Sequence, residues 1–428
     1  MNSAYKAIVR PCRIVTLHAI VGLLLLFLAL AASGFPQEIP PSTGASTRDA
    51  AAALAAGDLK RADNELQAVL RTTPTDVHAL NLLGIVRAQQ KRETEAESLF
   101  KQAIEIQPDF AGAHASLGLL YVQMGKDDLA ISPLQEAIRL DPARKDAQSA
   151  LINIWRSQAH AAVQHGNSEK ALALLISARK LNASDTDLQA NVQYDLGMVA
   201  LRMSLFPDAI DAFSEVLKIR PEDDRALYAL GRAKIATAKF DDAQQAFAHY
   251  IQLRPADASG HYALGVALQA LQRSSDARAE YKKSITLQPL QTEAYFQLGS
   301  LDLEAGNIDA AREKFEQVLK RAPQHVGALN GLGRVRFHEK KYSDAATLFE
   351  KAIAANSESR EAHYYLGLTD ARLSKKEESE KELQTASRIE HGEVERHQNM
   401  LRILDPDQIQ SEQIQPDQTH GAASNPNQ

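Results

Sequence analysis

A glycine recurs every 34 residues through most of this chain. It stands at Gly84 and Gly118 and then, in one unbroken register, at Gly197, Gly231, Gly265, Gly299, Gly333 and Gly367. A proline repeats with the same step, at Pro221, Pro255, Pro289 and Pro323. Because the chain has only 21 glycines in 428 residues, a shared register of this length indicates one structural unit repeated many times.

The residues within each period have the spacing of a helix hairpin. Leu83 and Gly84 fall on one face of a first helix, and Ala96 and Phe100 follow at i and i+4 on a second. Pro108 ends the second helix, because proline lacks an N–H and its ring clashes with the preceding turn. Aromatic residues make up only 6% of the chain, so strand-forming residues are scarce. The sequence therefore predicts an all-α fold.

This pattern resembles the tetratricopeptide repeat family, whose 34-residue unit carries W-x-x-L-G-x-x-Y in a first helix and A-x-x-x-F in a second, with a later A and P. The resemblance covers the periods 77–110, 111–144, 152–185, 190–223, 224–257, 258–291, 292–325, 326–359 and 360–393, with a weaker one at 43–76. It implies an α-solenoid, a right-handed superhelix of about ten antiparallel helix hairpins. It implies little about biochemistry, because this fold hosts many unrelated partners.

One joint departs from the period. Seven extra residues stand at 145–151 and four at 186–189, which is nearly two helical turns and about one turn. The simplest account lengthens two successive first helices, giving an irregular repeat at 145–189 between N-terminal repeats at 43–144 and C-terminal repeats at 190–393. The joint either offsets these two groups for a function or is a tolerated insertion.

The first segment concerns export. Lys6, Arg10 and Arg13 precede an apolar run at 14–32, which is the order of a signal peptide. Residues 1–34 are therefore a signal peptide cleaved near 31–34, or an uncleaved N-terminal anchor, and 35–46 a flexible leader. In both cases the rest of the chain is exported, so we expect it in the periplasm or cell envelope. Cys12 is the one cysteine and precedes the apolar run.

The other end is predicted to close the array. Residues 394–404 are expected to form a separate capping helix over the last hairpin, as terminal elements do in solenoids. Gln, Pro, Asp and Asn dominate 405–428, so this segment is expected to be a disordered tail.

The composition and motifs argue against several functions. The net charge of −6 is unsuited to a broad nucleic-acid surface. The sequence has none of the common nucleotide-binding, hydrolase or zinc motifs, and its 13 histidines are dispersed. We therefore predict no enzyme activity, no cofactor and no metal site.

The family resemblance implies that the second, fifth, ninth, twelfth and thirteenth residues of the first helices line a groove that binds protein or peptide partners. At the fifth position the chain carries Tyr194, Tyr228, Tyr262, Phe296 and Tyr364, and arginines occupy other groove positions at Arg202, Arg225, Arg232 and Arg334. In one interpretation these rings are exposed and bind a partner with the arginines, and folding hardly depends on them. In the other, repeat duplication copied a residue that packs against the neighbouring helix.

The sequence thus predicts a non-enzymatic protein-interaction scaffold of the cell envelope that binds a partner segment in the groove. The alternative is an accessory subunit of an envelope assembly for secretion, pili or polysaccharide export. Contact with the membrane is expected only through an uncleaved N-terminal segment.

Overall fold

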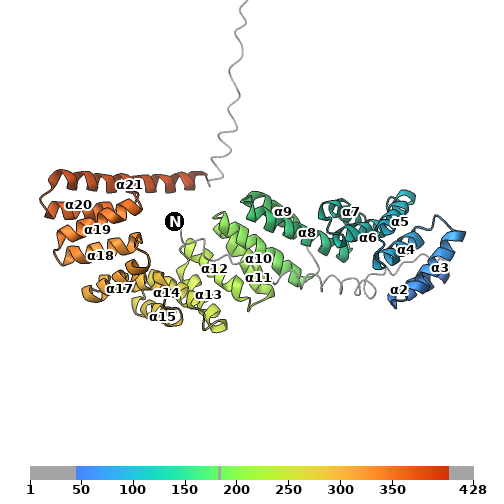
Figure 1. Ribbon diagram of the computed structural model, residues 1–428, viewed down its shortest axis with the longest axis horizontal. Coiled ribbons are helices and arrows are strands. Elements are labelled where there is room, and N and C mark those ends of the chain that lie inside the picture. Colours follow the sequence, from blue (N-terminus) through green and yellow to red (C-terminus); the bar gives the residue numbers. More distant parts are fainter. Residues whose placement is uncertain (1–44, 182–184, 404–428) are drawn as a thin grey trace, which may run out of the picture. The chain divides into compact units, whose positions relative to one another are not determined.

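The computed structural model describes residues 45–181 and 185–403, and in these two ranges the regular structure is helical throughout (Figure 1). The first helices of the hairpins are α2 (Ala45–Ala55), α4 (Val77–Gln89), α6 (Ala111–Gln123), α8 (Lys145–Gln164), α10 (Thr186–Arg202), α12 (Asp224–Ala236), α14 (Ala258–Ala270), α16 (Thr292–Glu304), α18 (Val326–His338) and α20 (Arg360–Arg372). The second helices are α3 (Leu59–Thr72), α5 (Glu93–Ile106), α7 (Asp127–Leu140), α9 (Ser168–Lys180), α11 (Phe206–Ile219), α13 (Phe240–Leu253), α15 (Ser274–Leu287), α17 (Ile308–Arg321), α19 (Tyr342–Ala355) and α21 (Lys376–Ile403). The predicted all-α fold is confirmed.

The chain divides into two compact units, 1–233 and 234–428. The packed hairpins are α2–α3, α4–α5, α6–α7, α8–α9 and α10–α11 in the first unit, and α14–α15, α16–α17, α18–α19 and α20–α21 in the second. Second helices also pack on the first helix of the next hairpin, as α5 does on α6 in the first unit and α15 on α16 in the second. Hairpins stacked on their neighbours in this way form the predicted α-solenoid.

The recurring glycine makes room for a large side chain of the second helix. A Cβ atom on Gly84 would lie 2.4 Å from the ring of Phe100, and one on Gly197 would lie 2.6 Å from the ring of Phe213. Both rings are fully buried. Burying a phenylalanine side chain stabilises a fold by about 2 to 3 kcal/mol. The repeated glycines therefore mark the places where a large side chain of the second helix is buried.

The turn inside the hairpins holds one residue with a positive φ at a fixed place in the period. Glycine occupies that place at Gly57, Gly125, Gly166 and Gly306. Other residues occupy it at Lys91, Ser204, Ala238, Gln272, Lys340 and Ser374. A side chain in the left-handed region costs about 1 kcal/mol, so the packing of the two helices imposes this backbone where the sequence offers no glycine.

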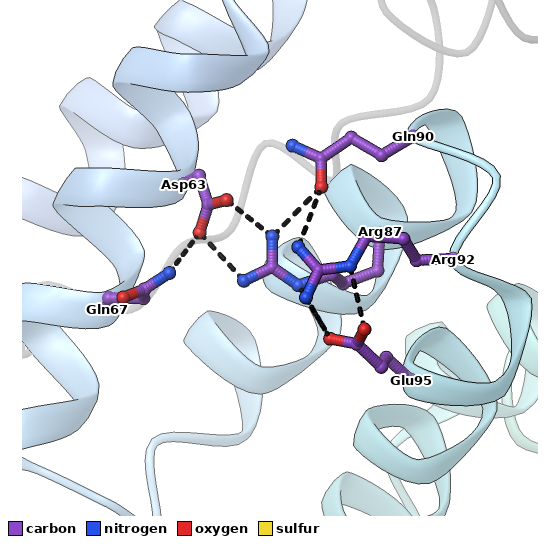
Figure 2. Close-up of polar contacts among 6 residues, drawn as sticks. All are labelled: Asp63, Gln67, Arg87, Gln90, Arg92 and Glu95. Carbon is purple, nitrogen blue, oxygen red and sulfur yellow. Dashed lines mark hydrogen bonds and ion pairs between the residues drawn. The ribbon is translucent and has the colours of Figure 1, made fainter.

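A buried ion pair joins the first two hairpins. Arg87 of α4 donates from Nη2 to Oδ1 of Asp63 in α3 at 2.9 Å, and from Nη1 to the other carboxylate oxygen. Figure 2 shows Asp63 pointing across to the Arg87 guanidinium, which Gln90 and Glu95 also approach. The Arg87 side chain is only 7% exposed. Hydrogen bonding from Arg87 lowers the pKa of Asp63 below its usual range.

The same two places in the period make polar contacts elsewhere. Tyr121 of α6 donates to Glu97 of α5 at 2.9 Å, and in the second unit Arg278 of α15 donates to Asp302 of α16 at 2.6 Å. In all three contacts the partners are 24 residues apart. Directional contacts of this kind fix how one hairpin is seated on the next, which apolar packing alone specifies less strictly.

The irregular joint has the predicted form. Helix α8 has 20 residues and α10 has 17, whereas α4, α6 and α12 have 13 each. The differences of seven and four residues match the extra residues in the sequence, so the predicted lengthening is confirmed. Trp155 of α8 packs, partly buried, against the apolar clusters on both sides of this helix. A functional role for the joint stays a prediction.

The C-terminal end differs from the prediction. Helix α21 runs from Lys376 to Ile403 without a break, so the separate capping helix at 394–404 is wrong. The segment has no proline, and its many Glu, Lys, Gln and Arg residues are strong helix formers that carry the helix through Gly392. The signal peptide or anchor at 1–34, nearly all of the leader at 35–46 and the tail at 405–428 lie outside the described residues.

Candidate partner-binding site

Three of the fifth-position rings pack on the buried ring of their own hairpin's second helix. The pairs are Tyr194–Phe213, Tyr262–Tyr281 and Phe296–Phe315, with ring centroids 5.8, 5.8 and 6.2 Å apart. The inner ring of each pair is fully buried and the outer ring is half-buried. The outer rings thus make the packing contacts of the second interpretation, and how much folding depends on them stays a prediction. Partner binding through their accessible edges stays a prediction.

Tyr194 of α10 lies among charges from the next first helix. The guanidinium of Arg225 in α12 stacks over its ring, 4.7 Å from the centroid. Burial raises the pKa of the Tyr194 hydroxyl, while Arg225 and Arg232 act to lower it and Asp223 and Asp195 to raise it further. Tyr194 and Arg225 are thus brought together, as the groove hypothesis requires, and Arg232 is exposed on the same helix as Arg225. Tyr228 of α12, at the fifth position, is half-buried.

A carboxylate joins α10 to the lengthened helix α8. Arg156 of α8 donates from Nε to Oδ2 of Asp195 at 2.7 Å, and His160 Nε2 lies 3.1 Å from the other oxygen. The Asp195 side chain is nearly buried, whereas that of His160 is 57% exposed. Arg156 and His160 therefore both contact the residue that follows Tyr194 in α10.

Two further residues of α10 extend this surface. Met198 is 39% exposed, although it is a large apolar side chain. Arg202, one helical turn later, is exposed and makes no ion pair with any residue that the structure describes. We define the α8–α12 face as Arg156, His160, Tyr194, Met198, Arg202, Arg225 and Arg232. The sequence prediction missed Met198 and His160, although both occupy the ninth, groove-facing place in their repeats.

The second unit holds the remaining predicted residues in other surroundings. Arg334 of α18 donates to Glu361 of α20 at 3.2 Å and lies over the ring of Tyr365, 5.1 Å from its centroid. Tyr364, which is 43% exposed, meets Tyr365 edge to face. Phe296 instead contacts the imidazole of His325 at 4.9 Å. Arg334, the predicted groove arginine of this unit, is thus paired with a carboxylate.

The same places in helix α6 are closed. Ala115 is fully buried and Leu119 is 8% exposed, and both belong to an apolar cluster that includes Ile154 of α8. In the second unit the fifth residue of α18, Asn330, is also buried and donates to Ser359 at 3.3 Å. A place that lines the groove in the family is therefore not accessible in every repeat of this chain.

Within 45–181 and 185–403, no helix combines the length and the apolar character needed to cross a bilayer. No three side chains of His, Cys, Asp or Glu in the described parts of the chain lie close enough together to hold a metal ion.

The chain belongs to the tetratricopeptide repeat family. One family model of that description matches residues 49–111, 156–224, 296–358 and 340–389, which is more than half of the chain. Two others of the same description match 200–266, and 111–144 with 258–289. The family resemblance seen in the glycine and proline register is confirmed.

Curated relatives match part of the chain. The human PEX5-related protein is 28% identical over 175 residues, which cover 40% of this chain and 27% of that protein. Superkiller protein 3 of Schizosaccharomyces pombe is 30% identical over 151 residues, covering 33% and 10%. The aligned segments thus span about a quarter or less of these relatives. Among solved structures, MamA of Desulfovibrio magneticus RS-1 is 21% identical with a TM-score of 0.38, covering 41% of this chain and 96% of that one.

Proposed function

We propose that this chain is an exported, non-enzymatic scaffold of the cell envelope that binds a protein partner on the α8–α12 face. The membership of the tetratricopeptide repeat family and the hairpin array support a protein-interaction scaffold. Nearly every described residue belongs to a hairpin, which leaves little room for a separate catalytic domain. The relatives' names include the Candida albicans peroxisomal targeting signal receptor, which agrees with a binding role.

One observation carries the location of the site. Met198, an exposed apolar side chain, lies one turn from exposed Arg202 and on the same helix as Tyr194. Isolated exposed apolar residues are ordinary on protein surfaces. An apolar side chain that lies between an aromatic residue and an arginine on one helix face has the composition of a binding hot spot.

Export rests on the sequence alone. Three basic residues precede the apolar run at 14–32, and everything after such a segment crosses the membrane. Cell fractionation with N-terminal sequencing tests this part. We expect a protein outside the cytoplasm that starts near residues 32–35, and a soluble cytoplasmic protein that retains Met1 would contradict it.

Photo-crosslinking in the producing cells tests the binding site. A benzophenone amino acid at position 198 should trap a partner as a defined adduct in the envelope fraction. Leu129 on the second helix α7 is 55% exposed. It is the matched control position, because it is an exposed apolar residue like Met198 but lies outside the face. Equal adducts from positions 198 and 129, or none from 198, would contradict the proposed site.

A further inference from the structure

We infer that the α8–α12 face selects an acidic peptide segment, one that places carboxylates on Arg202 and Arg225 and an apolar side chain on Met198. This inference rests on the proposed function and adds the chemistry of the partner. It follows from the charges near this face, where the carboxylates are covered and the guanidinium groups are exposed.

The carboxylates of the face are buried and already used. Asp195 accepts from Arg156, and its side chain is 10% exposed. Asp223 accepts from the backbone N–H of Ala226 at the start of α12, and its side chain is 8% exposed. Arg156 pairs with Asp195, and Arg220 and Arg225 lie 3.9 and 3.8 Å from Asp223. Because these cations offset the charge of both carboxylates, the carboxylates repel an approaching anion only weakly.

The cations, by contrast, are accessible. The Arg225 side chain is 60% exposed, and its Nε lies 3.8 Å from Asp223, a loose pairing. Arg202 has no ion-pair partner among the described residues, and Arg232 is exposed on the next first helix. A partner therefore meets guanidinium groups first, and guanidinium binds carboxylate in a two-pronged geometry. Exposed Glu222 and half-buried Asp224 are the other acidic residues that stand beside Arg225 in the sequence.

The groove places of the second unit carry more acidic side chains than those of the α8–α12 face. Glu293 and Glu361 occupy the second position of α16 and α20, with side chains 49% and 43% exposed, and Glu304 is exposed at the end of α16. Of the two arginines at groove places there, Arg334 is bound to Glu361, whereas Arg372, at the thirteenth place that Arg202 holds in α10, is exposed. A preference for acidic segments should therefore depend on the first unit.

A random peptide library displayed on phage, selected on the full exported chain, tests this inference without a known partner. We expect enriched peptides rich in Asp and Glu beside a large apolar residue. A synthetic peptide of the enriched sequence should bind about tenfold more weakly to the R202E/R225E variant, with a smaller loss for R202Q/R225Q, and weaken as salt is raised.

The control variant is R139E, which changes an exposed arginine on the second helix α7, 67% exposed and paired only within its own helix. It should bind like the unaltered chain, and far-UV circular dichroism should show all variants equally helical. Enriched peptides without an acidic bias would overturn the inference but leave the scaffold function intact. Enrichment of no peptide would count against both, and equal losses in R139E and R202E/R225E would reduce the effect to overall charge.

Discussion

Helices α4 and α10 carry an arginine in the last turn, and the two arginines have opposite surroundings. Arg87 is buried and donates to the Asp63 carboxylate of the preceding hairpin from Nη1 and Nη2. Arg202 is exposed and has no carboxylate partner in the described residues. In both helices the repeated glycine faces a phenylalanine ring of the second helix of the same hairpin. The difference shows that one residue type stabilises the stack in one region and stays available to a partner in another.

The strongest test of this comparison is Arg87→Ala against Arg202→Ala. Removing Arg87 leaves the Asp63 carboxylate without its buried partner, which should cost about 3 kcal/mol. Removing Arg202 should change the free energy of unfolding by no more than about 0.5 kcal/mol. Urea unfolding followed by circular dichroism measures both. Similar losses for the two variants would show that Arg202 is also a structural residue.

The same ion pair predicts an acid dependence. The folded-state pKa of Asp63 lies below its unfolded value, so the unfolded chain binds more protons in mild acid. The stabilisation is complete above the unfolded value, near pH 4, and is lost as the pH falls through the lower folded value. Asp63→Asn should remove this part of the pH dependence at the cost of lower stability at pH 7. An unchanged acid limb in thermal melts would contradict the role of the pair.

The contact between the repeated glycine and the ring of the second helix should be equally sensitive to substitution in the α4–α5 and α10–α11 hairpins. Gly84→Leu and Gly197→Leu force side chains into the rings of Phe100 and Phe213, where a Cβ alone would already clash. Each should cost about 2 kcal/mol or more, and hydrogen exchange should rise mainly in the altered hairpin and its neighbours. Loosening of the whole chain by either variant would contradict a stack held by local contacts.

The aromatic positions separate packing from binding. Tyr194→Ala removes the ring that covers Phe213 and should lower the free energy of unfolding by about 1 kcal/mol, whereas Tyr194→Phe should retain nearly all of it. Met198→Ala, on the same helix, should leave folding unchanged and weaken binding of the enriched peptide. If Tyr194→Ala is as stable as the unaltered chain, the packing role of the ring is refuted.

The smallest expected effect is an increase in stability. Lys91 and Ser204 hold the left-handed place in the turns of the α4 and α10 hairpins. Replacing either with glycine should raise the free energy of unfolding by about 1 kcal/mol, since the same turn is required in both regions. Gly125→Ala, at the equivalent place, should lower it. Thermal melts of the three variants check the signs, and a loss for both glycine variants would contradict the common turn.

Much of the fold could be predicted from the sequence, because periodic glycines and prolines report steric requirements that each hairpin must satisfy. The lengths of α8 and α10 also followed from the extra residues at 145–151 and 186–189. The left-handed turn was missed, although Gly57, Gly125, Gly166 and Gly306 mark it. The separate cap at 394–404 failed because helix propensity continued α21 where no proline stops it.

The site was less predictable, because exposure depends on what the neighbouring hairpins supply. Ala115 and Tyr194 share a place in the period, yet one is buried in a cluster with Ile154 and the other lies beside exposed arginines. Likewise, Arg87 takes its partner from Asp63, 24 residues earlier, whereas Arg202 stands two places later in its repeat and pairs with no described residue. The family positions indicate where a groove can be, and the packing of each repeat decides whether it is accessible.

Hydrogen–deuterium exchange of the full chain, with and without the enriched acidic peptide, tests the central claim most directly because it reports on both regions at once. We predict slower exchange on binding in α8, α10 and the first turns of α12, with no change in α4 and α6. Protection centred on α4 and α6, or on the first helices of the second unit, would contradict the assignment of the binding surface to the α8–α12 face.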